Sequence, residues 1–242
     1  MLIGHKFNIA ALTAIFSIFS PLTQADIVIN GTRIIYAEKD KNVNTRLENK
    51  GTRPLLVQTW LDTGNDNADP SSIKVPFNAT PPVSRIEPKH GQTITITYTG
   101  SQQLPKDRES VFWFNVLEIP PKASDAEVAD KNLLQLAFRT RIKLFYRPTG
   151  LTGESFDAPA AIKWRWNGNK ISVTNPTQYH VSYASATLKA NGKEYAVKTT
   201  MVPPKGDAVF SVDGLNSAVS GAKITYSAIN DFGSSVTGHA SL

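Results

Sequence analysis

Apolar and polar side chains alternate along most of the chain after residue 25. Residues 93–98 (TITITY) and 134–138 (LQLAF) are clear examples. Successive side chains of a β-strand point to opposite faces of a sheet, so this period of two is typical of half-buried strands. Turn-forming pairs such as Asn167-Gly168 recur at short intervals. Short strands joined by frequent turns predict an all-β protein made of β-sandwiches.

The first 25 residues do not follow this pattern. Met1 to Lys6 is a short, positively charged start, residues 7–19 form a mostly apolar run, and the small residue Ala25 precedes the expected cleavage point. This arrangement is typical of a secretory signal peptide. A transmembrane helix needs about 20 apolar residues, so the run is too short to span a membrane. We therefore expect export without membrane insertion.

Length and one break in the pattern predict two domains. Removing the signal peptide leaves 242 − 25 = 217 residues, which is comfortable for two domains of about 100 residues each. Residues 147–153 (RPTGLTG) interrupt the alternation with one proline and two glycines. We predict a signal peptide at 1–25, an N-terminal domain at 26–147, a linker at 148–153 and a C-terminal domain at 154–242.

The segment 133–147 is unusual for a sandwich strand. It contains no Gly, Pro or Asn, and at about 3.3 Å per residue it would form a strand near 50 Å long, against a usual 17–20 Å. Leu134, Leu136 and Phe138 begin an apolar row, whereas Arg139 and Arg141 belong to the polar face. The row is either one face of a long core strand, which periodicity alone favours, or it is partly offered to another chain.

Candidate chemistry is sparse. The chain has no cysteine, which excludes disulfides, thiolate metal sites and cysteine nucleophiles. None of its four histidines has metal-ligand spacing, and there is no nucleophile elbow or phosphate-binding glycine loop. We predict a protein that is not an enzyme and that uses no metal or cofactor. The net charge of +6 is spread without a basic run of five, so we do not expect nucleic-acid binding.

Trp164 and Trp166 leave one alternative open. Stacked indole rings bind sugars, so these two residues could form the platform of a secreted two-domain adhesive or carbohydrate-binding module. Alternate aromatic residues on a strand next to a turn are more often core residues or cross-strand pairs. The sandwich pattern alone does not separate these functions.

Several motifs, in this order, resemble the periplasmic pilus-assembly chaperones of the chaperone–usher pathway of Gram-negative bacteria. They are residues 30–36 (NGTRIIY), 79–85 (ATPPVSR), 104–116 (LPKDRESVFWFNV), 142–148 (IKLFYRP), 175–177 (NPT) and 229–233 (INDFG). Each motif is weak alone, but together they cover most of the chain after residue 25. The resemblance implies two immunoglobulin-like sandwiches set at an angle, with a cleft between them, in the periplasm.

The resemblance also implies a function and its residues. Chaperones of this family bind pilin (fimbrial) subunits, whose own sandwich lacks its last strand, by donor-strand complementation, and they deliver the subunits to an outer-membrane usher. Leu134, Leu136 and Phe138 would then fill the groove of the subunit. Arg33 and Lys143 would hold the C-terminal carboxylate of the subunit in the cleft and so fix the register of its strand.

Three further expectations rest on the same resemblance. Glu109, Arg147 and Asp231 match positions that form a charged network between the two domains. The loop from about Ile119 to Asn132 is short, which favours the short-loop branch of the family. A long apolar edge is an aggregation hazard when nothing covers it. We therefore expect that the chaperone, when it holds no subunit, can self-associate through the donor strand.

Overall fold

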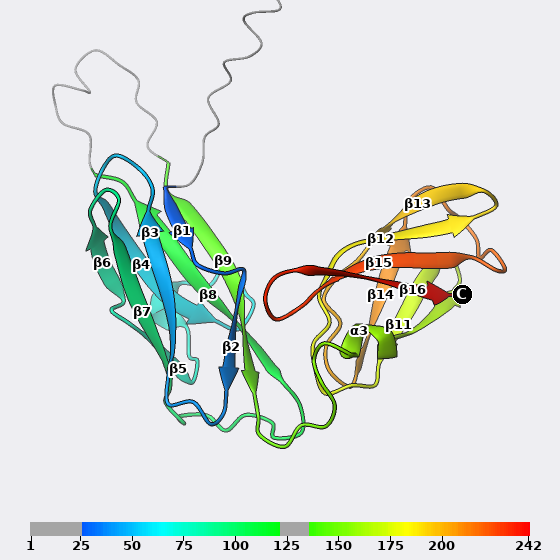
Figure 1. The fold of residues 1–242 in the computed structure, drawn as a ribbon, viewed down its shortest axis with the longest axis horizontal. Helices are drawn as coiled ribbons and strands as arrows, with labels where there is room; N and C mark the ends of the chain where they lie inside the picture. Colours follow the sequence, from blue (N-terminus) through cyan, green and yellow to red (C-terminus); the bar gives the residue numbers. More distant parts are fainter. Residues whose placement is uncertain (1–25, 122–135) are drawn as a thin grey trace, which may run out of the picture.

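The structure, a computed structural model, describes residues 26–121 and 136–242. The expected signal peptide at 1–25, Leu134 of the expected donor row and most of the loop before residue 132 lie outside these residues. The short-loop assignment therefore stays a prediction. The described chain forms two β-rich lobes that meet at an angle (Figure 1).

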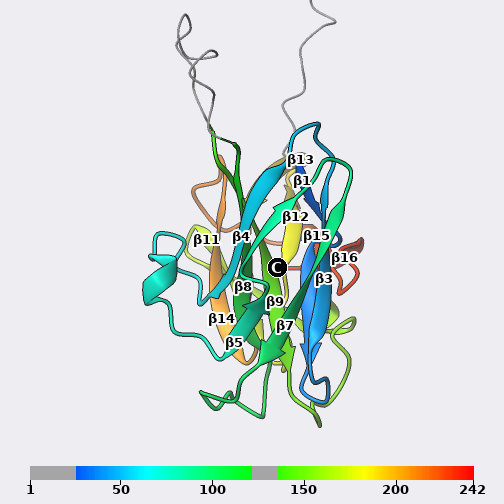
Figure 2. The ribbon, with the colours of Figure 1, turned by 90° about the vertical axis from the view of Figure 1, so that its left-hand side faces the viewer.

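The N-terminal lobe is a sandwich of two sheets within the described residues. Its strands are β1 (Ile27–Ile29), β2 (Arg33–Ala37), β3 (Val43–Asn49), β4 (Leu55–Asp62), β5 (Phe77–Thr80), β6 (Val83–Ile86), β7 (Gly91–Tyr98), β8 (Ser110–Ile119) and β9 (Phe138–Arg147), with a 3₁₀ turn η1 (Pro70–Ser72). The first sheet has the order β1-β3-β7-β5 and the second has the order β2-β9-β8-β4-β6. Figure 2 shows these two layers from the side of this lobe.

The C-terminal lobe contains the remaining described elements. They are a short helix α3 (Ala158–Ala161) and the strands β10 (Lys163–Asn167), β11 (Lys170–Asn175), β12 (Tyr183–Ala190), β13 (Lys193–Lys198), β14 (Gly206–Val212), β15 (Lys223–Ile229) and β16 (Ser235–Ser241). The strands follow the hydrogen-bonded order β10-β11-β14-β13-β12-β15-β16. The all-β, two-sandwich fold predicted from the sequence is confirmed. The boundary predicted at 148–153 remains a prediction.

Alternating side chains build the core of the N-terminal lobe. In β7, Ile94 and Ile96 are fully buried, while the threonines beside them face outward or lie half-buried. Burial of such side chains stabilises each by about 1.5–3 kcal/mol relative to exposure. Tyr36 and Tyr146 pack against Phe77, with ring centroids 5.5 and 6.0 Å apart. The same alternation that predicted strands therefore also supplies the core.

Trp164 and Trp166 belong to the C-terminal lobe itself. Trp164 is 7% exposed, and its ring stacks on Tyr226 with centroids 5.6 Å apart. Trp166 is partly buried against the same core, and its Nε1 donates to the carbonyl of Val219 at 3.2 Å. Because the indole of Trp164 is buried in the core of its own domain, it cannot serve as a platform for a sugar. The adhesive or carbohydrate-binding alternative is therefore not favoured.

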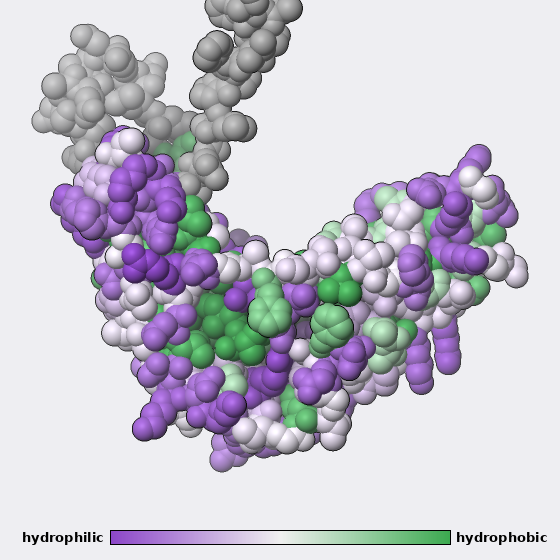
Figure 3. Space-filling view, viewed as in Figure 1, coloured by the Kyte–Doolittle hydropathy of each residue, from purple (hydrophilic) through white to green (hydrophobic). Residues whose placement is uncertain are grey.

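A narrow pocket lies where the two lobes meet. Its walls include Arg33 and Arg147 of the N-terminal lobe and Phe156, Ile229 and Asp231 of the C-terminal lobe. The space-filling view shows the molecule hollowed at this bend, with apolar residues gathered on the wall of the N-terminal lobe that faces it (Figure 3). In the described part of the chain, no helix is long and apolar enough to cross a membrane.

Candidate functional site

Strands β2 and β9 bring Arg33 and Lys143 side by side. The two strands run parallel, and Arg33 is the register partner of Lys143. The next residues along each strand, Ile34 and Leu144, are buried in the core. Because side chains alternate along a strand, both cations project from the opposite face of the sheet, toward the junction of the lobes. The pair predicted from the sequence is thus brought together.

Both cations are held by groups of the C-terminal lobe. Arg33 Nη1 donates to the carbonyl oxygen of Ile229 at 3.0 Å, and Lys143 Nζ donates to Oγ of Ser182 at 3.2 Å. Burial, and then the positive charge of Arg33, lower the pKa of the Lys143 ammonium. Burial also lowers the pKa of the Arg33 guanidinium, although the charge of Asp231 acts in the opposite direction.

Neither cation is neutralised by an ion pair. Among residues 26–121 and 136–242, Arg33 and Lys143 have no carboxylate within 4.0 Å, whereas Arg147 close by contacts two. Arg33 Nε is buried and has no hydrogen-bond partner there. Two neighbouring cations in a half-buried position each disfavour the charged form of the other. A bound carboxylate would offset this electrostatic cost. The pair therefore has the chemistry of an anion site.

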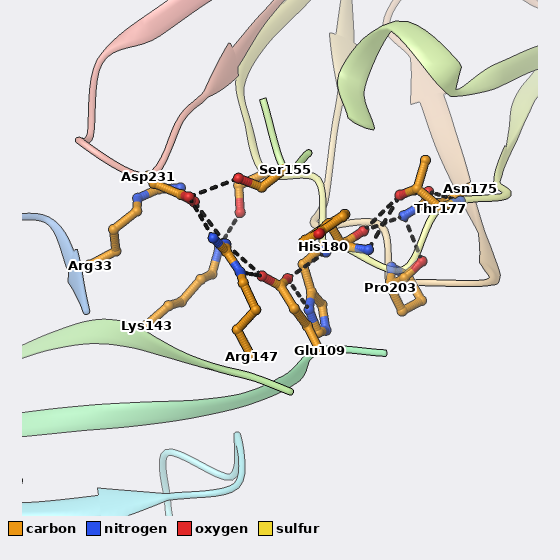
Figure 4. A network of polar contacts seen from close by, with 12 residues as sticks. Arg33, Glu109, Lys143, Arg147, Ser155, Asn175, Thr177, His180, Pro203 and Asp231 are labelled. Atoms are coloured by element: carbon orange, nitrogen blue, oxygen red, sulfur yellow. Dashed lines mark hydrogen bonds and ion pairs between the residues drawn. The ribbon is translucent and has the colours of Figure 1, made fainter. Parts of the chain in front are cut away.

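A charged network ties the lobes together next to this pair (Figure 4). Arg147 Nε and Nη2 donate to Glu109 Oε1 at 2.9 and 2.7 Å, and its Nη1 donates to Asp231 Oδ2 at 2.8 Å. On the other side, the backbone N–H of His180 donates to Glu109 Oε2 at 2.8 Å, and Ser155 Oγ donates to Asp231 Oδ2 at 2.7 Å. Glu109, Arg147 and Asp231 meet between the lobes, as expected from the sequence.

The pKa values in this network follow its contacts. Burial raises the pKa of the Asp231 carboxyl, but hydrogen bonds from Arg147 and Ser155 outweigh it and hold that pKa below its ordinary value. Burial lowers the pKa of Arg147, and its bonds to Asp231 and Glu109 more than compensate and raise it. Asp231 and Arg147 are therefore both charged at neutral pH.

The turn between β15 and β16 places Asp231 in this network. Asn230 Oδ1 accepts hydrogen bonds from the backbone N–H groups of Phe232 and Ser234 at 3.0 and 2.9 Å. This is the usual role of Asn in a tight turn. Gly233 has a φ of 83°, and a Cβ there would lie 2.4 Å from Oγ1 of Thr32 in the N-terminal lobe. The motif 229–233 thus encodes a turn that lies directly against the other lobe.

The apolar row of β9 divides into two halves. Leu144 is 0% exposed in the core, whereas Phe138 at the start of the strand is 45% exposed and Leu136 before it is 54% exposed. Ile142 packs partly against the core between them. Neither interpretation of the segment is right for its whole length, because one half fills the core and the other half faces outward. Leu134 lies outside the described residues.

The exposed half of the row lies along an open sheet edge. On one side, β9 pairs with β8 over its whole length, from Phe138 opposite Glu118 to Tyr146 opposite Ser110. On its other side, β2 pairs only from Lys143 onward. In the described part of the chain, the edge before Lys143 has no strand beside it. Such an edge offers unpaired N–H and C=O groups to another chain.

The edge and the two cations together fit one kind of ligand. A strand added beside Phe138 and parallel to β9 would point its carboxyl end at Arg33, because β2 occupies the same edge from Arg33 onward. Its terminal carboxylate would meet the cation pair there, and its apolar side chains would meet Leu136 and Phe138. The arrangement can hold an extended apolar peptide by its C-terminus.

Several contributors to this site could not be recognised in the sequence. Ser182, Ser155 and His180 meet the charged residues only because β12 and the segments before it fold against the other lobe. His180 lies beside Glu109, with Nδ1 3.1 Å from Oε2. No cluster of His, Asp and Glu that could hold a metal ion is present among the residues that the structure describes.

Comparison with protein families gives two matches that follow each other along the chain. Residues 26–152 match the family described as pili and flagellar-assembly chaperone, PapD N-terminal domain. Residues 157–240 match the pili assembly chaperone PapD, C-terminal domain.

Individual relatives extend over nearly the whole chain. The chain is 59% identical to the probable fimbrial chaperone YadV of Escherichia coli K12 over 93% of each sequence. It is 44% identical to the chaperone protein HifB of Haemophilus influenzae, covering 89% of this chain and 88% of the relative.

Solved structures agree with these relatives. The crystal structure of the YadV chaperone matches with a TM-score of 0.80 and 56% identity, covering 90% of this chain and 100% of that one. A Salmonella enterica complex of the SafA pilin with the SafB chaperone matches with a TM-score of 0.76 and 26% identity, covering 91% of this chain and 98% of that one.

Proposed function

The chain belongs to the PapD family of pilus-assembly chaperones, and from this premise we propose that it captures pilin subunits on the open edge of β9. It acts as a binding protein and not as an enzyme. The proposal extends to the residues: Leu136 and Phe138, together with Leu134, enter the apolar groove of the subunit, and Arg33 with Lys143 holds its C-terminal carboxylate.

One observation carries this proposal. An exposed apolar row runs along an unpaired sheet edge and leads to two cations that have no ion-pair partner among the described residues. Full burial of each apolar side chain would contribute about 1.5–3 kcal/mol before the cost of ordering is subtracted. The row therefore supplies affinity, and the backbone groups of the edge supply the pairing.

The cation pair supplies the register. A slip by one residue would turn every side chain of the subunit strand to the wrong face. The guanidinium of Arg33 offers a planar fork and the ammonium of Lys143 offers a point charge. A carboxylate held by both has one position along the edge, so the end of the subunit strand fixes the alignment of all residues before it.

Location and further partners follow from the same proposal. The chaperone works in the periplasm after removal of residues 1–25, and it hands its subunits to an outer-membrane usher. The similar SafB chaperone was solved in complex with the SafA pilin, and this supports a pilin subunit as the first partner. Without a subunit, a second copy of the chaperone can cover the exposed row, so self-association belongs to the proposal as well.

Co-purification tests the proposal directly. A tagged chaperone is co-expressed in the periplasm with pilin subunits from the genome that encodes it, and the complex is analysed by size exclusion. We expect a one-to-one complex with at least one subunit. Recovery of the chaperone alone, with binding to a glycan array, would instead support the carbohydrate-binding alternative. The variant Arg85→Gln is a suitable control, because this exposed arginine forms a surface ion pair with Glu87.

A further inference from the structure

A buried carboxylate lies on the outer face of the five-stranded sheet, opposite the core of the N-terminal lobe. Asp62, at the end of β4, is 1% exposed. Asn115 Nδ2 donates to its Oδ2 at 2.7 Å, and the backbone N–H of Gly64 donates to its Oδ1 at 2.6 Å. The proposed carboxylate site does not use this group. A buried charge of this kind persists only when it is paired and hydrogen-bonded.

The cations that pair with Asp62 come from β9. Arg141 Nε donates to Asp62 Oδ2 at 3.1 Å, and Arg141 Nη2 also binds Oδ1. Arg139 Nη2 lies 3.5 Å from Oδ2, and Arg139 Nε donates to Asn115 Oδ1 at 2.9 Å. Burial raises the pKa of the Asp62 carboxyl, but the bonds from Arg141, Asn115 and Gly64 outweigh it and lower that pKa. The carboxylate is therefore charged and holds both arginines.

Two tryptophans add a second set of contacts to the same arginines. The guanidinium of Arg139 lies 5.0 Å from the ring centroid of Trp60 on β4. The guanidinium of Arg141 lies 4.9 Å from the ring centroid of Trp113 on β8. Both distances are in the range of cation–π attraction. Arg139 and Arg141 are thus fixed by charge, by hydrogen bonds and by stacking.

These contacts fall on the half of β9 that has the least core packing. From Lys143 onward, β9 is held by β2 on one edge, by β8 on the other and by buried Leu144 in the core. Between Phe138 and Ile142, β8 is the one described strand whose backbone pairs with β9, and the side chain of Phe138 is exposed. An edge segment with few buried apolar contacts opens more readily than a core strand.

We infer that Arg139 and Arg141 are positioning residues for subunit capture: anchored on Asp62 and stacked on the tryptophans, they hold the open half of β9 as a strand before a subunit arrives. The inference rests on the proposed function and deepens it. The side chains alternate, so anchoring Arg139 and Arg141 on the outer face fixes the direction of Phe138 and Thr140 on the other. The apolar row is then held in one conformation before binding. Subunit binding therefore loses less conformational entropy in β9.

Preorganisation has a kinetic consequence. If the strand is binding-competent only part of the time, the apparent Kd rises by the reciprocal of that fraction. Loss of the anchor should therefore slow association and leave dissociation nearly unchanged, because a bound subunit itself holds β9 in place. A residue that touches the subunit directly would instead accelerate dissociation.

The test uses Arg139→Gln, Arg141→Gln and the double variant, with Arg85→Gln of β6 as the matched control. Arg85 is an exposed arginine of the same sheet whose partner is Glu87. Hydrogen exchange is measured in the chaperone alone for those amides of residues 138–142 that bond to β8. We expect exchange at least about tenfold faster in the double variant than in the wild type or the control, with the amides of residues 143–147 unchanged.

The second measurement uses the pilin subunit that co-purifies with the wild type, unfolded in urea and diluted into chaperone. We expect the association rate to fall in proportion to the fraction of chaperone in which residues 138–142 form an ordered strand. Arg141→Lys should restore part of the rate, because the positive charge opposite Asp62 returns. Unchanged exchange and unchanged association would overturn the inference, and so would a faster dissociation alone. If the double variant does not fold, Arg139→Gln is compared alone, since it leaves the Arg141–Asp62 pair intact.

The exchange measurement needs no subunit, so the two proposals fail separately. If no pilin co-purifies with the wild type, the proposed function is wrong, whatever the exchange rates are. If Leu136→Glu abolishes capture but the arginine variants exchange and associate like the control, the capture edge is right and the anchor is wrong.

Discussion

Arg33 and Lys143 are costly residues at their positions. Each is half-buried, each lies beside the other cation, and burial lowers the pKa of both. A chain selected only for stability would place an acid between them or keep both in solvent. This cost has a reason if a ligand supplies the missing negative charge, because the favourable charge pairing that the free protein lacks then adds to the affinity for that ligand.

Replacing either cation by alanine should abolish the subunit complex. Arg33→Ala removes the directional fork and Lys143→Ala removes the point charge, so neither variant fixes a carboxylate. We expect the free energy of unfolding to change by no more than about 1 kcal/mol, because the lost hydrogen bonds are offset by relief of charge repulsion. Co-purification and thermal unfolding are measured on the same preparations. Loss of folding would indicate a structural role for the pair instead.

Exchanging the two cation types should restore capture only in part. Arg33→Lys keeps the positive charge but loses the planar fork of the guanidinium. Lys143→Arg places a bulkier guanidinium where the Lys143 ammonium donates to Ser182. We expect a Kd between those of the wild type and the alanine variants, measured by titration with purified subunit. Wild-type affinity in both exchanged variants would show that charge alone is recognised.

Subunit binding should weaken at alkaline pH. In the free chaperone the pKa of Lys143 is lowered by burial and by Arg33, and a carboxylate bound beside it would raise that pKa again. The affinity that Lys143 contributes is then fully present below the pKa of the free protein, and it is lost as the pH rises through the higher pKa of the complex. Titrations from about pH 7 to about pH 10 measure this loss. Lys143→Arg stays charged throughout, so its profile should be flatter than that of the wild type.

The sequence indicates the residues of the candidate site, but it does not indicate the contacts that hold them. Arg33 and Lys143 were assigned through the family motifs, since a single cation on a strand is otherwise a solvated charge. Their adjacency depends on parallel pairing of two strands that are far apart in the chain. Ser182 and His180 carry no local signal, because their roles arise only when the second lobe packs against the first.

At the scale of the element, the alternating apolar row that runs along β9 is buried at one end and exposed at the other. Leu144 and Tyr146 are core residues, while Phe138 and Leu136 face outward. The change occurs where β2 begins to pair, at Lys143. Periodicity predicted one strand with one apolar face, and it could not locate this change because both halves have the same pattern. Burial differs between the halves because neighbouring strands cover only one of them.

A charge placed in each half of the row should therefore have opposite effects. Leu136→Glu puts a carboxylate in a position that is 54% exposed, so we expect the isolated chaperone to fold normally. In the complex the same carboxylate would enter an apolar groove without a partner, at a cost of several kcal/mol, and capture should fail.

Leu144→Glu is the matched control in the core. Leu144 is fully buried, so the same substitution should unfold the N-terminal lobe. Circular dichroism on both purified variants, together with subunit co-purification, separates the two halves. Unfolding of Leu136→Glu would mean that the donor-strand proposal is wrong, because that position would then be part of the core.

At the scale of the molecule, the proposed capture site depends on how the two lobes meet. Arg33 and Lys143 belong to the N-terminal lobe, but their hydrogen-bond acceptors, the carbonyl of Ile229 and the hydroxyl of Ser182, belong to the C-terminal lobe. The close approach of Gly233 to Thr32 adds a steric contact at the same place. A rotation of one lobe would therefore change the geometry of the proposed carboxylate site without altering either cation.

Glu109 is the most buried charge of the network that fixes this arrangement. It is 4% exposed and links Arg147 of its own lobe to the backbone and ring of His180 in the other. Among the described residues, Glu109→Ala would leave Asp231 as the ion-pair partner of the Arg147 guanidinium. The cost should therefore be smaller than the about 3–5 kcal/mol of leaving a buried charge without any partner. We expect a lower unfolding temperature, a wider distribution of lobe angles and weaker subunit capture, although Arg33 and Lys143 remain in place.

The matched control for Glu109 is two residues away in the same loop. Asp107 also reaches the other lobe, through an ion pair with Lys205 at 2.8 Å, but its side chain is 50% exposed. Exposed ion pairs contribute little to stability, so Asp107→Ala should leave unfolding, lobe angle and capture close to the wild type. Small-angle scattering reports the lobe angle, and co-purification reports capture. If Glu109→Ala weakened folding but left scattering and capture unchanged, the network would be a source of stability only, and the lobe angle would have to be set by the apolar and steric contacts around Gly233.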